Sequence, residues 1–148
     1  MGRGAGELMM SEQLVKAAID AAAQAYAPYS NFHVGAALLL ADGSIVTGAN
    51  FENASYGMTL CAETAAIAKA NSDGQLLQIV AIAVAGGPAG RALGKEPITP
   101  CGRCRQVMKE VADLVAIDLP VYCAHDGGFV TYRLSELLPH GFGPASLG

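Results

Sequence analysis

The spacing of apolar and polar residues predicts four helices along the chain. Ser11 is expected to cap the first helix, and Pro28 to end it. The later segments are rich in helix formers or carry apolar residues at helical spacing. The predicted helices cover residues 11–26, 61–71 and 102–114, with a short one between Ser135, as its N-cap, and Pro139. Residues 1–10 are expected to form a flexible tail, and residues 11–148 a single domain.

Five short apolar segments between and after these helices predict strands. They cover residues 34–40, 45–48, 77–85, 120–124 and 129–133. The first two flank a turn at Asp42-Gly43 and form a hairpin, whereas the third is continuously apolar, which is typical of a strand buried on both faces. Strand–helix–strand crossovers after the hairpin predict an α/β fold, a three-layer α/β/α sandwich with a mixed five-stranded sheet. Both crossover helices should then start at the same edge of the sheet.

The composition indicates a folded domain and narrows the classes of partner. Of the 148 residues 52% are hydrophobic and 15% are charged, which excludes a disordered chain. The net charge of −4 offers no basic surface, so a nucleic acid polymer is not expected as a partner. The sequence contains no apolar run long enough to span a membrane, and its N-terminus lacks the apolar core of a signal peptide. We therefore expect a cytoplasmic protein.

Three of the four cysteines stand at the starts of the two predicted crossover helices. Cys61 opens the first, and Cys101 and Cys104 open the second, where residues three apart share a face. If the two helix starts are neighbours, the three thiolates can bind one Zn²⁺ and leave one tetrahedral position open, as catalytic zinc sites do. Helix N-termini also lower the pKa of cysteine thiols, which favours the anionic ligands.

Two other interpretations of the cysteines remain open. Cys123 could complete a closed site, which would make the protein a non-catalytic, structural zinc-binding module. Its place inside a predicted strand fits a small buried apolar residue better. The Cys101–Cys104 pair could alternatively be a redox pair of the thioredoxin type, but such a pair does not call for a third cysteine on another helix.

A glutamate accompanies the predicted metal ligands. Glu63 follows Cys61 by two positions and falls in the first turn of the same helix. Alone, a carboxylate there would be interpreted as a residue that complements the helix dipole. Beside a zinc ion it can accept a proton and later return it to a leaving group, so we predict a catalytic role.

The combination of Cys-Ala-Glu with Pro-Cys-x-x-Cys resembles the zinc-dependent deaminases of nucleosides and nucleobases. The stretches YSNFHVGAALL, TGANFENASYG, TPCGRCRQVMKE and LLPHGFGPASL occur in the order found in cytidine deaminases, and the resemblance covers about residues 14–147. It points to the short-chain, homotetrameric branch of the cytidine/deoxycytidylate deaminase family. The resemblance implies one Zn²⁺ per subunit and hydrolytic deamination of cytidine and deoxycytidine to uridine and deoxyuridine, with release of ammonia, in pyrimidine salvage.

The resemblance also assigns the residues around the metal and the base. Glu63 is expected to shuttle protons, and Ala62 and Glu63 to read the amino edge and N3 of cytosine. Phe32 occupies the position of an aromatic residue that stacks on the base. The implied zinc ligands are Cys61, Cys101 and Cys104.

Further assignments concern the sugar and the neighbouring subunits. Asn50 and Glu52 match positions that hydrogen-bond the ribose hydroxyls, and an amide with a carboxylate suits a diol. Ala54, Tyr56 and Phe142 match positions that reach the site of a neighbouring subunit. The resemblance therefore implies a homotetramer with shared active sites and a small nucleoside as substrate.

One position departs from the family pattern. An arginine usually follows Cys-Ala-Glu, where it offsets the charge of the thiolates, but this chain has Thr64. We hypothesise that Arg103, Arg105 or Arg91 balances this charge instead. Partners of this kind change metal affinity or activity by roughly 10–100-fold.

The resemblance leaves another small-molecule deaminase as an alternative. Deaminases of the cytosine antibiotic blasticidin S share Cys-Ala-Glu and PCGRCRQ. The stretch NFENASY, residues 50–56, fits the nucleoside branch better.

Overall fold

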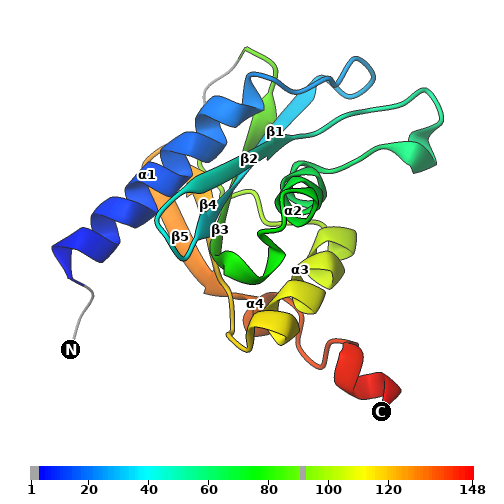
Figure 1. Ribbon diagram of the computed structural model, residues 1–148. Helices are drawn as coiled ribbons and strands as arrows, with labels where there is room; N and C mark the ends of the chain where they lie inside the picture. The colour runs from blue at the N-terminus through cyan, green and yellow to red at the C-terminus, as the bar shows by residue number, and fades with distance from the viewer. Residues whose placement is uncertain (1–3, 91–92) are drawn as a thin grey trace.

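A mixed five-stranded sheet carries helices on both of its faces in the computed structural model, which describes residues 4–90 and 93–148 (Figure 1). The helices are α1 Ala5–Ala22, α2 Ala62–Ser72, α3 Gly102–Val115 and α4 Leu134–Leu137. The strands are β1 Phe32–Leu40, β2 Ile45–Ala49, β3 Ile79–Pro88, β4 Pro120–His125 and β5 Gly128–Arg133. Short 3-10 turns cover Tyr56–Met58, Leu76–Gln78 and Pro144–Leu147. Within the described ranges, no helix is both long and apolar enough to cross a membrane.

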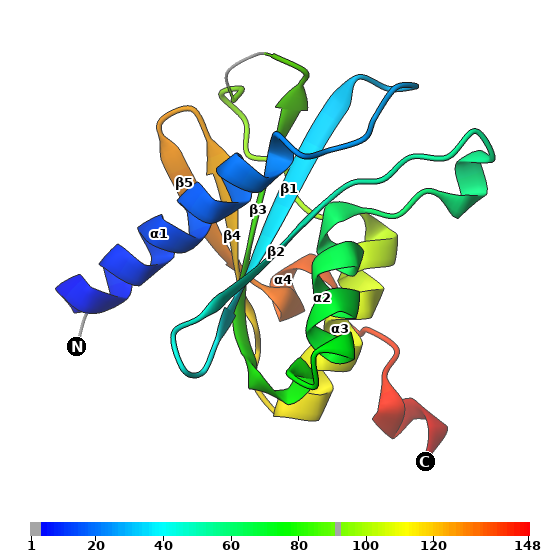
Figure 2. The ribbon, with the colours of Figure 1, turned by 45° about the horizontal axis from the view of Figure 1, so that its top comes forward.

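The layers are those predicted from the sequence. Helix α1 covers one face of the sheet, and α2 and α3 lie side by side on the other (Figures 1 and 2). Each face has its own buried apolar cluster, and a strand residue such as Ala37 packs toward α1 while its neighbour Leu38 packs toward α2 and α3. This alternation is the period of two that a strand imposes. The three-layer α/β/α sandwich is therefore confirmed.

The strand order of the sheet is β2-β1-β3-β4-β5. Strands β1 and β2 form the predicted hairpin, and β1 also pairs antiparallel with β3. Strands β3 and β4 are the one parallel pair of the sheet in the described part of the chain, and α3 lies in the connection between them. Helix α2 lies in the connection from β2 to β3, so the two helices that carry the cysteines return to the same face.

A glycine in β2 lets α2 approach the sheet closely. A Cβ atom at Gly48 would lie 2.6 Å from the backbone nitrogen of Ala66 and 2.7 Å from the carbonyl oxygen of Ala62. Both atoms belong to the helix backbone and cannot move aside alone. Any side chain at position 48 would therefore push α2, with the residues at its start, away from the strand.

The predicted start of the first helix is wrong by six residues. Helix α1 begins at Ala5, so residues 5–10 of the expected tail are helical, and residues 1–3 lie outside the described residues. Ser11 does not cap the helix but is buried within it, where its hydroxyl donates to the carbonyl oxygen of Glu7 at 3.0 Å. Glu7, Leu8 and Met9 are good helix formers, so nothing in the sequence stops the helix at Ser11.

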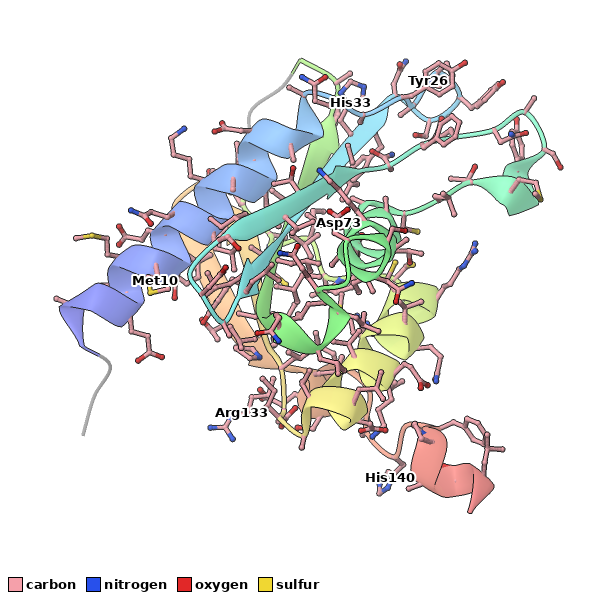
Figure 3. The ribbon with its side chains drawn as sticks, in the orientation of Figure 1. Met10, Tyr26, His33, Asp73, Arg133 and His140 are labelled. Atoms are coloured by element: carbon pink, nitrogen blue, oxygen red, sulfur yellow. The ribbon has the colours of Figure 1, made fainter. Side chains whose placement is uncertain are left out.

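The predicted end of the first helix is also wrong. Helix α1 ends at Ala22 rather than at Tyr26, because Tyr26 pairs with the loop after β2. Its N–H donates to the carbonyl oxygen of Asn50 at 3.0 Å, and its carbonyl oxygen accepts from the N–H of Glu52 at 2.8 Å. The Tyr26 ring, which is labelled in Figure 3, also meets the ring of Phe51 edge-on, with centroids 5.9 Å apart. A contact distant in sequence thus overrides the local preference for a helix.

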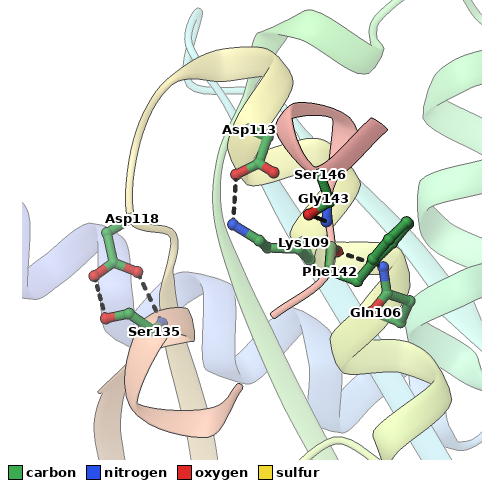
Figure 4. A network of polar contacts seen from close by, with 8 residues as sticks. All are labelled: Gln106, Lys109, Asp113, Asp118, Ser135, Phe142, Gly143 and Ser146. Carbon is green, nitrogen blue, oxygen red and sulfur yellow. Dashed lines mark hydrogen bonds and ion pairs between the residues drawn. The ribbon is translucent and has the colours of Figure 1, made fainter. Parts of the chain in front are cut away.

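The last helix is short, as predicted, but its N-cap is not Ser135. Helix α4 begins at Leu134 after Arg133, whose backbone N–H donates to Glu136 Oε1 at 2.8 Å. The Ser135 hydroxyl and N–H instead donate to the carboxylate of Asp118, at 2.5 and 2.9 Å (Figure 4). Ser135 therefore ties the helix to the segment before β4.

Candidate metal centre and active site

Three cysteine sulfurs converge where α2 and α3 begin. Cys61 is the N-cap residue of α2 and Cys101 that of α3, while Cys104 lies in the first turn of α3. The three Sγ atoms all lie within 4.8 Å of one another, and those of Cys61 and Cys101 are 3.7 Å apart. The sequence-based prediction that the two helix starts are neighbours is confirmed.

The N-cap positions leave the sulfurs free to face one another. The carbonyl oxygens of Cys61 and Cys101 accept the first helical hydrogen bonds, from Ala65 and Arg105, each at 3.0 Å. Neither cysteine side chain caps its own helix. The free N–H groups and the positive dipole ends of both helices therefore favour thiolate anions at this point.

The donor set fits one Zn²⁺ per subunit. Tetrahedral zinc with Zn–S distances of about 2.3 Å places two sulfurs about 3.8 Å apart. The 3.7 Å between Cys61 and Cys101 agrees with that value and is far longer than a disulfide bond of about 2.05 Å. All four cysteines are free thiols.

Cys123 does not belong to this group. It lies in β4, between Val84 of β3 and Val130 of β5, and is fully buried in the apolar cluster under α2 and α3. Desolvation raises the pKa of its thiol to about 12. A closed site with four cysteines is therefore excluded, and the group Cys61, Cys101 and Cys104 leaves a tetrahedral position open.

Thr64, the residue that departs from the family pattern, contacts a sulfur directly. Its hydroxyl lies 3.4 Å from Cys104 Sγ. Among the residues that the structure describes, neither Arg103 nor Arg105 hydrogen-bonds a cysteine sulfur; Arg103 donates to the carbonyl oxygen of Thr59 at 3.3 Å. Arg91, the third candidate for charge balance, lies outside the described residues.

Glu63 is buried beside the cysteines. It is the second residue of α2, and only 3% of its surface is exposed. Burial raises the pKa of its carboxyl group above the ordinary value, while hydrogen bonds from its own backbone and from Cys104 oppose this in part. A buried carboxyl group with a raised pKa holds a proton more readily than an exposed one, which suits a general acid–base.

A cavity of about 220 Å³ opens beside Glu63 and the cysteines. Five of the predicted residues line it: Asn50, Cys61, Ala62, Glu63 and Cys101. The apolar part of the lining comes from Val34, Leu60, Val84 and Ile98. Thr59 and Thr99 also line the cavity. A cavity with apolar lining and a few polar groups is typical of a site for a small molecule.

Sequence reasoning missed several of these wall residues. Ile98 and Thr99 directly precede the Pro-Cys-x-x-Cys motif, which was the one available signal. Val34 and Val84 are ordinary strand residues, and only the pairing of β1 with β3 brings them together. A larger hollow of about 770 Å³ lies beside the C-terminal half of α3 and contains none of the predicted residues.

Asn50 and Glu52 hold the loops next to the cavity. The Asn50 amide accepts from the N–H of Val34 and donates to the carbonyl oxygen of Phe32, both at 2.9 Å. The Glu52 carboxylate accepts from the N–H of Tyr29 at 2.9 Å and from the hydroxyl of Ser30 at 2.6 Å. The Ser30 hydroxyl is the main reason that the pKa of Glu52 is lowered. Of the two, Asn50 lines the cavity and Glu52 lies outside it.

The other predicted residues do not line the cavity within one chain. Phe32 is half-buried at the start of β1, and Ala54 is exposed. Tyr56 is 74% exposed and packs edge-on against Tyr29, with ring centroids 5.8 Å apart. Phe142 is 57% exposed, and its carbonyl oxygen accepts from Gln106 Nε2 at 2.8 Å (Figure 4).

The α/β sandwich and the converging thiols define a zinc metalloprotein whose metal site has one open position. Residues 9–117 match the family described as "Cytidine and deoxycytidylate deaminase zinc-binding region". The chain belongs to this family, so the resemblance inferred from the sequence is confirmed.

Individual relatives agree over most of the chain. A cytidine deaminase of Halalkalibacterium halodurans is 50% identical over 135 residues, covering 90% of this chain and 95% of that protein. A cytidine deaminase of Mycobacterium tuberculosis is 45% identical over 127 residues, covering 85% of this chain and 84% of that protein. The crystal structure of cytidine deaminase from Burkholderia pseudomallei superimposes with a TM-score of 0.75 at 43% identity, covering 88% of this chain and 97% of that one.

Proposed function

We propose that the protein is a hydrolytic cytidine deaminase that converts cytidine and water into uridine and ammonia. The observation that carries the proposal is the convergence of three cysteine sulfurs next to a small cavity, which Cys61, Cys101 and the buried Glu63 line. The relatives with 45–50% identity are cytidine deaminases, which supports the nucleoside over blasticidin S as substrate. Cys61, Cys101 and Cys104 would hold one Zn²⁺ per subunit.

Glu63 carries the proton transfers of this reaction. Zinc, when bound, lowers the pKa of a coordinated water and so supplies a nucleophile at neutral pH. The Glu63 carboxylate takes up one proton of the water as the water oxygen bonds to C4, and delivers this proton to N3 of cytosine. It then takes the remaining proton from the new C4 hydroxyl group and gives it to the amino nitrogen. The C4–N bond breaks, ammonia leaves and the C4=O bond of uridine forms. Burial of Glu63 supports this role. A raised pKa lets its carboxyl group hold each proton after taking it up and before giving it to the base.

The cavity walls orient the base. Val34, Val84 and Ile98 offer apolar surface to its faces, and Ala62 lies beside Glu63 at the polar edge. Phe32, at the start of β1, would stack on the base. Asn50 and Glu52 would bind the sugar hydroxyls through the donors and acceptors that remain after their hydrogen bonds to the loops. The 2′-hydroxyl is not what these two residues require, so deoxycytidine is proposed as a second substrate.

A homotetramer would complete each site. Phe51 and Tyr56, in the loop after β2, and Phe142, near the C-terminus, are largely exposed in one chain. Exposed apolar surface of this kind can mark a protein–protein contact. We assign Ala54, Tyr56 and Phe142 to the cavity of a neighbouring subunit. The protein would act in the cytoplasm, within pyrimidine salvage, because three zinc-binding thiols stay reduced in a reducing compartment.

An assay of ammonia release tests the reaction directly. We expect turnover of cytidine and deoxycytidine, little or none of blasticidin S, and loss of activity after dialysis against a zinc chelator, because the open metal position is required. Adding Zn²⁺ back should restore the activity. Equal turnover of blasticidin S would favour the alternative substrate, and full activity without metal would contradict the proposal.

Complementation between two inactive variants tests the shared sites. Glu63→Ala removes the proton shuttle of its own site. Phe142→Ala removes the aromatic ring that is proposed to complete the cavity of a neighbouring subunit. When both chains are co-expressed, some sites combine an intact Glu63 with an intact Phe142, so part of the activity should return. Light scattering of the wild type should give about four times the 15.1 kDa of one chain. A monomeric mass, or no recovery in mixed oligomers, would refute the tetramer with shared sites.

A further inference from the structure

We propose that Arg105 is a positioning residue for the zinc site and that it acts through hydrogen bonds rather than through its charge. It would hold the segment before Cys101 in place and connect it to α4. The inference rests on the zinc ligands of the proposed function and adds a residue that does not touch the metal or the substrate.

The Arg105 side chain uses all three guanidinium nitrogens on oxygen atoms of other segments. Its Nε donates to the carbonyl oxygen of Pro100 at 2.7 Å, and its Nη1 donates to the carbonyl oxygen of Leu137 at 2.7 Å. Its Nη2 donates to the hydroxyl of Thr99 at 3.1 Å. The side chain is half-buried, so these bonds are partly shielded from water.

These contacts hold the backbone of Cys101 and the two residues before it. The backbone N–H of Arg105 donates to the carbonyl oxygen of Cys101 at 3.0 Å, while its side chain reaches back to the two preceding residues. Pro100 is fully buried, and Thr99 lines the cavity. Leu137 is the last residue of α4, so the guanidinium joins the cysteine segment to a helix that follows the sheet. A shift of this segment would move the Cys101 sulfur away from Cys61.

The geometry separates this role from simple charge balance. In the described part of the chain, no guanidinium nitrogen of Arg105 hydrogen-bonds a cysteine sulfur. The planar fork of arginine can reach three separate oxygens, whereas the single nitrogen of lysine carries the same charge and cannot. Arg103 provides a matched control, because it lies on the same first turn of α3 and, among the described residues, its side chain makes one hydrogen bond, to Thr59, at 3.3 Å.

The experiment measures zinc affinity by competition with a chromogenic chelator in Arg105→Lys, Arg105→Gln, Arg103→Gln and the wild type. We expect both Arg105 variants to bind zinc about tenfold more weakly, within the range of about 10–100-fold typical of residues that orient metal ligands. Arg103→Gln should stay within about twofold of the wild type, although it loses the same charge. Substitution of cobalt for zinc adds a second readout, because its sulfur-to-metal absorption should shift in the Arg105 variants only.

The outcomes separate this inference from the proposed function. Wild-type affinity and cobalt absorption in Arg105→Lys would overturn the hydrogen-bonding role and leave the zinc site standing. Equal weakening in Arg105→Gln and Arg103→Gln would also overturn it, in favour of charge. A wild type that binds no zinc would refute both. If Arg105→Gln fails to fold, Arg105→Lys decides, because it retains the charge and the long apolar stem of the side chain.

Discussion

Replacing Glu63 with alanine is expected to lower kcat for cytidine by roughly 10²–10⁴-fold while one zinc per chain remains bound. Glu63 lies within the first turn of α2 and is almost completely buried beside Cys104, yet it is not one of the three converging sulfur ligands. Its removal therefore takes away the proton carrier and leaves the ligand set in place. Steady-state kinetics and metal analysis of the same preparation check both halves of the result.

Two control variants sharpen this experiment. Glu63→Gln keeps the size of the side chain and a hydrogen-bonding group but cannot carry a proton, so its activity should fall about as far as that of Glu63→Ala. Glu110→Gln changes an exposed carboxylate on α3 and should leave kcat unchanged. High activity in Glu63→Gln with zinc bound would show that the carboxyl group is not the proton shuttle.

Replacing Cys104 with alanine is expected to weaken zinc binding by roughly 10²-fold or more. The apparent free energy of zinc binding, about 10–16 kcal/mol in structural zinc sites, is shared among the ligands, so loss of one ligand removes a large part of it. Cys123→Ala is the matched control. Both cysteines are fully buried in the same apolar cluster, so both substitutions remove the same atoms from similar surroundings. Only Cys104 belongs to the group of three sulfurs. Zinc content after dialysis should therefore fall in Cys104→Ala and stay at one per chain in Cys123→Ala.

Thermal unfolding gives a second measure of the same difference. A bound metal stabilises the folded state by mass action, so a chelator should lower the Tm of the wild type and of Cys123→Ala. The Tm of Cys104→Ala should respond little, because little metal is bound. Loss of zinc in Cys123→Ala, or its retention in Cys104→Ala, would contradict the ligand assignment.

The sequence predicts the metal centre well because its parts are local. Cys61 and Glu63 share the first turn of one helix, and Cys101 and Cys104 share the first turn of another. One rule of topology, that successive crossover helices start at the same sheet edge, was enough to bring the two turns together. The predicted fold and the predicted zinc cofactor are both confirmed. The roles of the residues that bind substrate remain proposals.

What the sequence did not predict depends on contacts between distant segments. Tyr26 is not part of α1, because its backbone hydrogen-bonds to Asn50 and Glu52. No feature of the sequence near Tyr26 predicts this pairing. Arg105 was considered only as a charge, because its bond to Leu137 spans 32 positions of the chain. Ser11 had the residue type of a helix cap but sits in the middle of a longer helix. In each case tertiary structure decided between options that local preference left open.

Cys61 and Cys101 are 40 positions apart, and the segment between them contains all of α2 and β3. An ion held by both cysteines therefore acts as a cross-link that closes a long loop. The conformational entropy lost in closing this loop is a cost of folding, and it does not recur in each catalytic cycle. The complete site of three thiolates does not exist in the unfolded chain, so it forms only when the starts of the two helices dock. The same ion thus links the chemistry of the enzyme to the stability of the segment from Cys61 to Cys101.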